Sequence, residues 1–293
     1  MLKLEHISKT YRVGAFGGGR LQAVDDVTFD VEPGEVISLI GESGSGKTTI
    51  GRMILRLSPI TTGRITFDGT DVSSLRRSHL KEYYRHVQGV FQDPFSSCNP
   101  IFKADRIFAL IKHEFFPEVS AQEWRHRVAA ALESVSLNPA DVLGKYPHQL
   151  SGGQLQRLLI ARALLLDIKI LVADEIISML DASTRIDVLN LLGDLKKRGL
   201  GIIFITHDLS LGNYISDRTV ILRHGAIVEM GATEKVFGDP RHPYTQSLLA
   251  SVAQLHTKWG PEEPGPALDP RRAESAQAPA LVSVADDHLV AVG

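Results

Sequence analysis

Residues 41–49 read Gly41-Glu42-Ser43-Gly44-Ser45-Gly46-Lys47-Thr48-Thr49, and they join an apolar run, residues 36–40, to a segment with helical spacing. The apolar run predicts a buried strand, and the spacing predicts a helix. Strand, glycine-rich loop and helix, with the pattern G-x-x-x-x-G-K-[ST] at the junction, are the parts of a P-loop. A glycine-rich turn with a chance lysine would need neither flanking element. The sequence therefore predicts a site for a nucleoside triphosphate.

The residue types of this loop suit a phosphate chain. Gly41, Gly44 and Gly46 let the backbone turn so that successive N–H groups face the phosphates, and the helix N-terminus adds its dipole. Lys47 would reach the β- and γ-phosphates, and the Thr48 hydroxyl would bind Mg²⁺. The whole stretch from Gly41 to Thr49 is the predicted nucleotide-binding loop.

The composition limits the class of protein. In 293 residues, 32 Lys and Arg nearly balance 34 Asp and Glu, so nothing predicts a basic surface or a nucleic-acid partner. The one cysteine, Cys98, excludes an intrachain disulfide and a cysteine-built metal site. The first residues alternate like a strand rather than a signal peptide, and no apolar run approaches the length of a membrane span. We therefore expect a cytosolic chain that meets a membrane only through a partner.

The patterns along the chain predict an α/β fold. Period-two alternation before residue 31 predicts a small N-terminal sheet, and buried-strand runs alternating with helical patterns predict a parallel sheet covered on both faces. Residues 94–158 are rich in helix formers and lack β-branched runs, which indicates an inserted helical subdomain. Residues 1–255 would form one domain. Residues 256–293, rich in Pro, Ala, Asp, Glu and Ser, would be a disordered tail.

Two further segments carry candidate chemistry. Asp174 and Glu175 end an apolar strand; beside a P-loop the first carboxylate would hold Mg²⁺ and the second would polarise a water, although alone the pair could be ordinary surface acids. The run Ser151-Gly152-Gly153-Gln154 fits a helix capping box. Its two glycines weaken a first helical turn by about 1 kcal/mol each relative to Ala. Without side chains on the two glycines, a phosphate can approach the backbone N–H groups at the helix N-terminus closely. These residues can therefore both cap the helix and bind a phosphate.

Taken in order, these motifs resemble the nucleotide-binding subunit of an ABC transporter, from about Leu2 to Ala253. The ordered set consists of Tyr11, the P-loop, Gln92 after a strand, Leu150–Gln154, Asp174-Glu175, Ser178-Met179-Leu180-Asp181 and His207. The resemblance implies an ATPase with ATP and Mg²⁺ as cofactors. It also implies a P-loop NTPase core with an N-terminal antiparallel β subdomain and an inserted helical subdomain.

The resemblance further implies a site shared by two subunits that face each other head to tail. Each ATP would lie between the P-loop of one subunit and the Ser151–Gln154 helix end of the other. Tyr11 would stack on adenine, although an ordinary loop tyrosine is the alternative, and Asp181 would contact the opposite subunit.

The catalytic and metal roles are implied in the same way. Glu175 would polarise the attacking water, and His207 would bind the γ-phosphate and help to orient that water. Thr48 and Asp174 would hold Mg²⁺, and Gln92 would touch the metal or the water.

Two stretches narrow the family resemblance. Residues 91–100 resemble the Q-loop of the dipeptide/oligopeptide importer subfamily, and residues 240–249 resemble its C-terminal His-Pro-Tyr motif. That subfamily also contains importers of nickel and of oligosaccharides, so the substrate stays open. Residues 243–249 also fit a helix that begins at Pro243 and carries Tyr244 on its apolar face.

One departure from the family pattern is Ile176, which stands where proline usually follows the catalytic glutamate.

The resemblance therefore implies an ATP-hydrolysing subunit at the cytoplasmic face of a membrane, peripheral to it. Its partners would be a second cassette (a paralogue or a copy of this chain), membrane permease subunits and, indirectly, a substrate-binding protein. Other classes of P-loop protein fit the sequence less well. A non-transport ABC ATPase would usually carry a coiled-coil insertion or two cassettes, whereas this sequence has one cassette and no extended heptad pattern. A P-loop kinase would have no use for Leu150–Gln154 or His207, and an exporter's cassette is normally fused to membrane helices.

Overall fold

The computed structural model describes residues 1–13, 19–254 and 279–292, whose strands form two sheets. The N-terminal sheet is antiparallel throughout its described strands. These strands, in spatial order, are β2 (Gly19–Val31), β1 (Leu2–Val13), β4 (Thr62–Phe67) and β5 (Thr70–Asp71). The strands of the larger core sheet, in spatial order, are β11 (Ala280–Ala285), β12 (His288–Val292), β10 (Ala226–Ala232), β9 (Arg218–Arg223), β3 (Val36–Ile40), β8 (Gly201–Thr206), β7 (Ile170–Asp174) and β6 (Val87–Val90).

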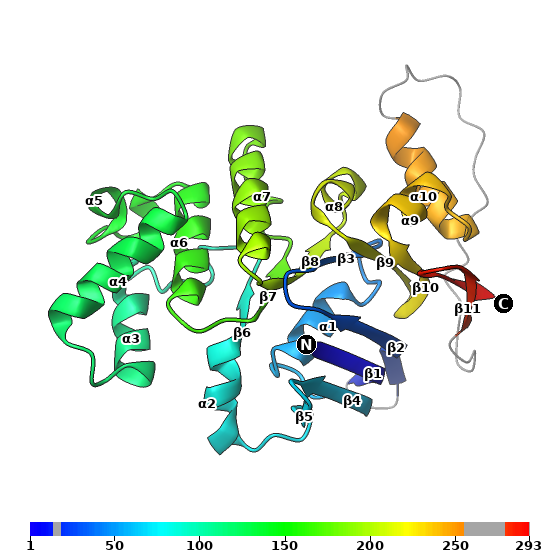
Figure 1. Ribbon diagram of the computed structural model, residues 1–293, viewed down its shortest axis with the longest axis horizontal. Helices are drawn as coiled ribbons and strands as arrows, with labels where there is room; N and C mark the ends of the chain where they lie inside the picture. The colour runs from blue at the N-terminus through cyan, green and yellow to red at the C-terminus, as the bar shows by residue number, and fades with distance from the viewer. Residues whose placement is uncertain (14–18, 255–278, 293) are drawn as a thin grey trace.

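The helices fall into two groups in Figure 1: one at the left-hand end and one around the sheets. The left-hand group lies between β6 and β7 in sequence and contains α3 (Arg106–Phe115), α4 (Ala121–Ser134), α5 (Pro139–Val142), the short 3₁₀ turn Pro147–Gln149 and α6 (Gly152–Leu164). The others are α1 (Lys47–Ile54), α2 (Arg77–His86), α7 (Ala182–Lys197), α8 (Leu209–Ile215), α9 (Thr233–Gly238) and α10 (Pro243–Gln254). The expected α/β fold, with an antiparallel N-terminal sheet and an inserted helical group, is confirmed. The end expected for that group, residue 158, falls inside α6.

The core sheet is covered on both faces. Strands β9, β3, β8, β7 and β6 run parallel to one another, and every residue of β3, β7 and β8 is buried. Alternate residues of β7 contribute to two cores. Leu171 and Ala173 belong to the core that contains α6 and α7 residues, whereas Ile170 and Val172 belong to the core shared with α1 and the N-terminal sheet. The parallel sheet predicted from the apolar runs is confirmed.

Helix α1 packs between the two sheets and thereby places the P-loop. Its buried Ile50 and Met53 share one core with Leu4 of β1 and Ile203 of β8. Gly51 allows the close approach, because an added Cβ would lie 3.0 Å from Ile205 Cδ1. The start of α1, where the glycine-rich loop ends, is therefore fixed against the core sheet.

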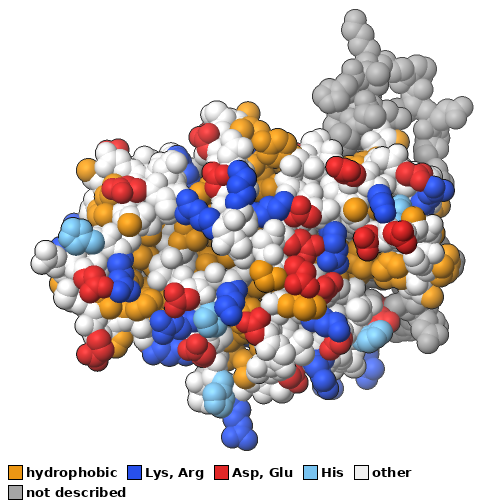
Figure 2. Space-filling view, in the orientation of Figure 1, with side chains coloured by type: hydrophobic (Ala, Val, Ile, Leu, Met, Phe, Trp, Pro, Cys, Tyr) orange, Lys and Arg blue, Asp and Glu red, His pale blue; other side chains and the backbone are white. Residues whose placement is uncertain are grey.

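The surface agrees with the balanced composition. On the face shown in Figure 2, Lys and Arg are interspersed with Asp and Glu and form no single basic field. Within the described residues, no helix combines the length and the apolar character needed to cross a bilayer.

The prediction of a disordered tail over residues 256–293 is wrong for its last part. Residues 280–292 form the hairpin β11–β12, and β12 adds to the edge of β10. Apolar, partly β-branched runs on each side of Asp286-Asp287 favour strands, and β10 supplies an edge with free backbone groups. This short pattern was obscured by the composition of the preceding residues. Residues 256–278 lie outside the described part of the chain.

Gly231 of β10 provides a test of the docked hairpin. A Cβ added there would lie 2.4 Å from the Asp287 backbone oxygen and 3.1 Å from His288 Cα. We expect Gly231→Ala to displace β12, to increase amide exchange over residues 280–292 and to destabilise the protein by about 1–3 kcal/mol, as overpacking does. Hydrogen–deuterium exchange and thermal unfolding measure both effects.

Gly238→Ala is the matched control, because a Cβ at Gly238 meets nothing within 4 Å. It should leave exchange in the hairpin unchanged. Wild-type exchange over residues 280–292 in the Gly231→Ala variant would contradict the docking of β12 on β10.

Candidate functional site

The predicted site residues follow the carboxyl ends of neighbouring parallel strands. The P-loop follows β3, Asp174 and Glu175 stand at the end of β7, and His207 follows β8. Gln92 follows β6, which pairs with β7. The carboxyl ends of parallel strands meet at one edge of a sheet, and ligands of open α/β sheets bind outside that edge.

The P-loop backbone is packed closely between two other segments of the chain. Gly46 has φ 101°, and a Cβ there would lie 2.6 Å from the Ala23 backbone oxygen. A Cβ at Gly41 would lie 2.2 Å from the Leu222 backbone oxygen. The Gly225 N–H also donates to the Ser45 backbone oxygen at 3.1 Å. Strand β2 and the β9–β10 turn therefore fix the curve of the loop.

The Lys47 ammonium lies inside this curve. Its Nζ donates to the Gly41 backbone oxygen at 2.6 Å, to the Glu42 backbone oxygen at 2.8 Å and to Ser45 Oγ at 3.2 Å. Burial lowers the pKa of Lys47, while the charges of Glu175 and other nearby acids oppose that shift. A buried cation at the mouth of a loop rich in N–H groups is suited to a phosphate chain.

Thr48 and Asp174 form the part of the site that fits a metal. Thr48 Oγ1 donates to Asp174 Oδ1 at 3.2 Å, and Asp174 is only 6% exposed. Burial raises the pKa of Asp174, because ionisation is disfavoured away from water, although the bond from Thr48 opposes the shift. A hydroxyl and one carboxylate fit Mg²⁺, which usually keeps several waters and takes few protein ligands.

Glu175 and His207 form the second polar pair. Glu175 Oε1 lies 3.3 Å from His207 Nδ1, and the His207 side chain is 62% exposed. Glu175 has φ 51°, a left-handed conformation that is uncommon outside glycine and is often found at functional sites. Its N–H donates to the Ile205 backbone oxygen at 2.9 Å, which ties the turn after β7 to β8. The buried Ile176 continues this turn into the core.

The structure does not bring Ser151–Gln154 to the P-loop of the same chain. Ser151 Oγ accepts from the Gln154 N–H at 3.1 Å, and Gln154 Oε1 accepts from the Ser151 N–H at 3.0 Å, so the expected capping box is confirmed. A Cβ at Gly153 would lie 2.4 Å from Thr184 Cγ2 on α7. Among the described residues, no hydrogen bond joins residues 151–154 to residues 41–49.

Asp181, Tyr11 and Gln92 also lie outside the contacts of the P-loop. Asp181 caps α7, and hydrogen bonds from the Ser183 hydroxyl and then from Thr184 lower its pKa. Tyr11 lies in β1, with its hydroxyl 3.4 Å from Ser58 Oγ. Gln92 is exposed beside the end of β7. The nucleotide, metal and dimer roles predicted for these three residues stay predictions.

One residue of the site was missed by the sequence reasoning. The Tyr244 hydroxyl accepts the Glu42 N–H of the P-loop at 3.2 Å. The predicted helix at Pro243 is confirmed by α10, and Tyr244 is buried as expected. No local pattern, however, relates residue 244 to residue 42. The His-Pro-Tyr stretch was the only available signal.

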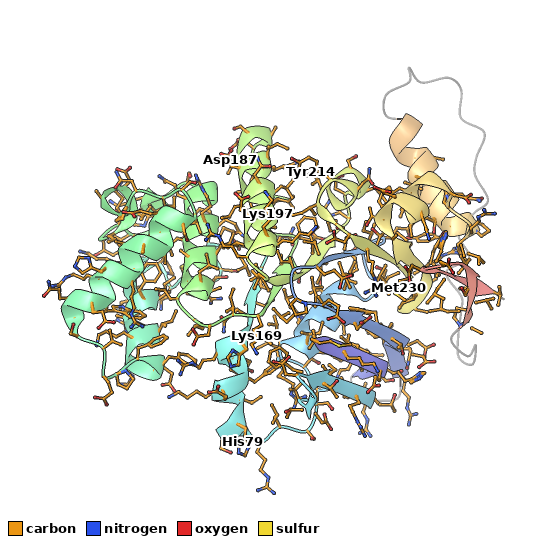
Figure 3. The ribbon with its side chains drawn as sticks, in the orientation of Figure 1. His79, Lys169, Asp187, Lys197, Tyr214 and Met230 are labelled. Carbon is orange, nitrogen blue, oxygen red and sulfur yellow. The ribbon has the colours of Figure 1, made fainter. Side chains whose placement is uncertain are left out.

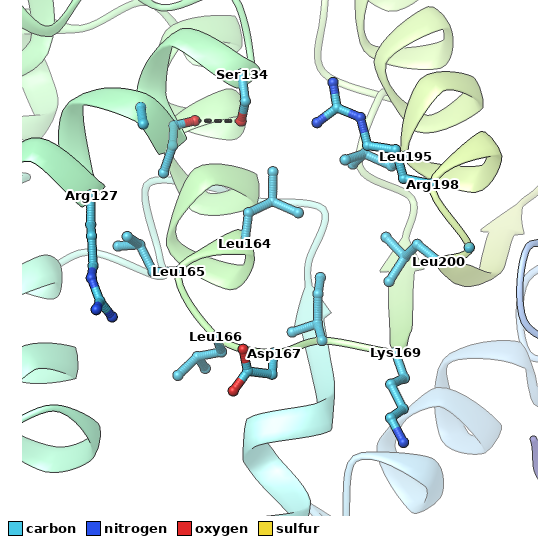
Figure 4. Close-up of a pocket in the computed structure, with 14 residues that line it drawn as sticks. Arg127, Ser134, Leu164, Leu165, Leu166, Asp167, Lys169, Leu195, Arg198 and Leu200 are labelled. Carbon is cyan, nitrogen blue, oxygen red and sulfur yellow. Dashed lines mark hydrogen bonds between the residues drawn. The ribbon is translucent and has the colours of Figure 1, made fainter.

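A cavity lies elsewhere in the described part of the chain. It measures about 650 Å³ and lies between α4, α6 and the segments that lead into β7 and β8 (Figure 4). Leu164, Leu165 and Leu200 line it together with the charged Arg127 and Arg198. The cavity contains none of the predicted site residues and borders the amino ends of the parallel strands, so it is not the predicted nucleotide site.

The raised pKa of Asp174 leads to a stability prediction for the metal-free protein. The folded state holds the proton of this carboxyl more tightly than the unfolded state, so stability falls as pH rises from the ordinary pKa of 3.8 through the raised value. Asp174→Asn removes the free-energy cost of burying an ionised carboxylate. At neutral pH in a metal chelator we expect a stabilisation of about 1 kcal/mol, or roughly 2–4 °C in Tm, and loss of Mg²⁺-dependent hydrolysis.

Thermal melts at pH 7 and near pH 4 test this prediction. The difference in Tm between Asp174→Asn and the wild type should shrink as the wild-type carboxyl becomes protonated. Asp187→Asn is the control: Asp187 is exposed on α7 and is labelled in Figure 3. A lower Tm for Asp174→Asn than for the wild type at pH 7 would contradict the unfavourable burial.

Comparison with known proteins gives consistent matches. The family model described as "ABC transporter" matches residues 24–178, and the one described as "Oligopeptide/dipeptide transporter, C-terminal region" matches residues 228–277. The chain is 42% identical to the oligopeptide transport ATP-binding protein OppF of Streptococcus mutans, covering 93% of this chain and 85% of that protein. It is 43% identical to the dipeptide transport ATP-binding protein DppF of Lactococcus lactis, covering 86% and 81%.

Among solved structures, the chain is similar to a dimeric ATP-binding cassette in a post-hydrolysis state bound to ADP and Pi. The TM-score is 0.72 and the identity is 29%, covering 80% of this chain and 99% of that chain.

Proposed function

The chain belongs to the ABC transporter family of ATP-binding proteins, and on this premise we propose that it couples ATP hydrolysis to the import of peptides through separate membrane subunits. It is an ATPase of the ABC type. The observation that carries the proposed mechanism is the convergence of Lys47, the pair Thr48–Asp174 and the pair Glu175–His207 on one sheet edge. This edge offers a phosphate-binding cation, a metal position and a polarising carboxylate side by side.

The role proposed for each site residue follows from its contacts. Lys47 binds the β- and γ-phosphates, and the loop N–H groups surround the phosphate chain. Bound Mg²⁺, held by Thr48 and Asp174, would neutralise charge on the phosphates. Glu175 accepts a proton from the attacking water, and His207, 3.3 Å from Glu175, orients the carboxylate and the γ-phosphate. Gln92, at the same edge, would sense the metal or the water.

The site is completed by a second cassette. Ser151–Gln154 presents a capped helix N-terminus with small residues, and its bonds are satisfied without the P-loop of the same chain. A facing cassette would place this end over the ATP, with Asp181 at the contact. The similar dimeric cassette bound to ADP and Pi supports this arrangement. Tyr11 would stack on adenine.

The cargo and location are proposed from the relatives. Proteins similar over most of this chain are named for oligopeptide and dipeptide transport, and the C-terminal region resembles the same group. We therefore favour peptides over oligosaccharides or nickel. The subunit would sit at the cytoplasmic face of the membrane, bound to permease subunits and served indirectly by a substrate-binding protein.

The test is ATPase activity of this subunit assembled with its co-encoded membrane proteins. The binding protein is added loaded in turn with peptides, oligosaccharides or nickel. Stimulation by peptide alone would support the proposal, and stimulation by another class would reassign the cargo. Hydrolysis that no membrane partner or ligand changes would overturn the transport function and favour a non-transport ATPase.

A further inference from the structure

Tyr244 connects the C-terminal region to the P-loop. Its hydroxyl accepts the Glu42 N–H at 3.2 Å, and its ring is buried in one cluster with Ile40, the last residue of β3, and Leu209, two residues after His207. The Arg223 guanidinium lies 5.0 Å from the ring centre. Tyr244 therefore bonds to the P-loop and belongs to the same buried cluster as the segment that follows His207.

The bond to Glu42 acts on a peptide unit that Lys47 also holds. The Glu42 N–H and the Gly41 carbonyl belong to the same planar peptide. Lys47 Nζ donates to the Gly41 oxygen at 2.6 Å, while Tyr244 accepts from the N–H. A phosphate chain bound at the loop would compete for the Lys47 ammonium, and so for its bond to this carbonyl. The Tyr244 hydroxyl then remains to hold the peptide in its orientation.

The position of Tyr244 is set by a short turn before α10. The Tyr244 N–H donates to His242 Nδ1 at 3.1 Å. The Arg241 N–H donates to Glu229 Oε1 at 2.8 Å, and the His242 N–H donates to Glu229 Oε2 at 3.0 Å. The two oxygens of one carboxylate in β10 therefore fix two successive backbone groups of this turn.

Glu229 receives a third donor from the C-terminal hairpin. His288 Nε2 of β12 lies 2.7 Å from Glu229 Oε1, and both side chains are buried. The imidazole tautomer that carries its proton on Nε2 fits this contact, because carboxylate oxygens accept hydrogen bonds. A buried carboxylate requires such partners. The C-terminal hairpin therefore helps to position the Glu229 carboxylate, which in turn fixes the turn at residues 241–244.

We propose that Tyr244 is a positioning residue of the nucleotide site, and that His288, through Glu229 and the 241–244 turn, fixes the Tyr244 hydroxyl against the P-loop. This inference rests on the proposed binding of ATP at that loop. It gives the C-terminal region a role in ATP affinity that is separate from any contact with cargo or membrane subunits.

The first test is Tyr244→Phe, which removes the hydroxyl and keeps the ring. A neutral hydrogen bond corresponds to a modest change in affinity, so we expect Kd for Mg–ATP to rise about 3–10-fold. The rate at saturating ATP should stay within about twofold, because no reacting group is altered. Amide exchange should increase over residues 41–47 and not over β10. Calorimetry, kinetics and hydrogen–deuterium exchange give the three readouts.

Tyr214→Phe is the matched control. Tyr214 lies on α8, and its hydroxyl bonds to Asn190 on the surface (Figure 3). This variant should keep wild-type affinity and exchange. If Tyr244→Phe also keeps both, Tyr244 does not position the loop and the proposal is overturned.

A double-mutant cycle tests the connection to the hairpin. His288→Gln removes the imidazole, and the double variant adds Tyr244→Phe. If His288 acts through the hydroxyl, His288→Gln alone raises Kd, by no more than Tyr244→Phe does, and the double variant binds ATP about as Tyr244→Phe does, so that the two effects are non-additive. An unchanged Kd in His288→Gln would overturn the proposed route. Full additivity would overturn the proposed route through Glu229.

A separate variant distinguishes the failure of this inference from the failure of the proposed function. Loss of ATP binding in Lys47→Ala, with no effect of Tyr244→Phe, would refute the positioning role alone. Unchanged ATP binding in Lys47→Ala would refute the nucleotide site itself, and with it the basis of this inference.

Discussion

Glu175→Gln should reduce ATP turnover by at least about 100-fold, since general bases contribute roughly 10²–10⁴-fold to rate. The substitution keeps the shape of the side chain and its Oε1 acceptor, which lies 3.3 Å from His207 Nδ1, but it removes the proton acceptor. ATP affinity should stay close to wild type, because Lys47 and Thr48 are untouched. With the partner cassette present, the ATP-bound complex should accumulate, because in the proposed cycle hydrolysis separates the two subunits.

Phosphate release and equilibrium ATP binding measure the two effects, and size-exclusion chromatography with ATP measures the third. Glu234→Gln, at an exposed position of α9, is the control for the charge change and should behave as wild type. Turnover of Glu175→Gln within a few-fold of wild type would assign the base to another residue.

Lys47→Ala should weaken ATP binding by roughly 10–150-fold. Hydrogen bonds to charged groups contribute about 1.5–3 kcal/mol, and each 1.4 kcal/mol is tenfold in affinity. The effect has a second cause in this structure. The ammonium also bonds to the Gly41 and Glu42 backbone oxygens, so its removal deletes two hydrogen bonds within the loop as well as the cation that attracts phosphate.

Calorimetric titration with Mg–ATP checks this prediction, with Lys197→Ala as the control. Lys197 is exposed at the end of α7 and pairs with Asp194; Figure 3 labels it. The control should bind ATP as the wild type does. An undiminished affinity in Lys47→Ala would remove the phosphate-binding role from residues 41–49.

The sequence was informative where chemistry depends on neighbouring residues. The glycine spacing of residues 41–47 and the capping pair Ser151–Gln154 are local patterns, and the structure has the turn and the cap that they predict. The parallel sheet was equally accessible, because strands buried on both faces are apolar throughout. The fold class followed from these patterns together with the family resemblance.

The parts that were missed depend on distant pairing. Tyr244 and Glu42 are separated by 202 positions, and no periodicity in the chain relates them. The composition of the whole tail predicts disorder over residues 280–292, whereas the stability of the hairpin found there depends on pairing with the edge of β10. The roles of Gln92 and Asp181 rest on a second molecule or a metal, which the fold of one chain does not contain.

The pairing of β12 with β10 has a consequence for the nascent protein. Glu229 is synthesised 59 residues before His288, which at about 5–20 residues per second corresponds to roughly 3–12 s of translation. During that interval a carboxylate destined for the interior has no imidazole partner, and the β10 edge presents free backbone groups. The growing chain can therefore complete the core sheet only after β12 has been made, so the speed of translation sets the earliest time at which that edge can close.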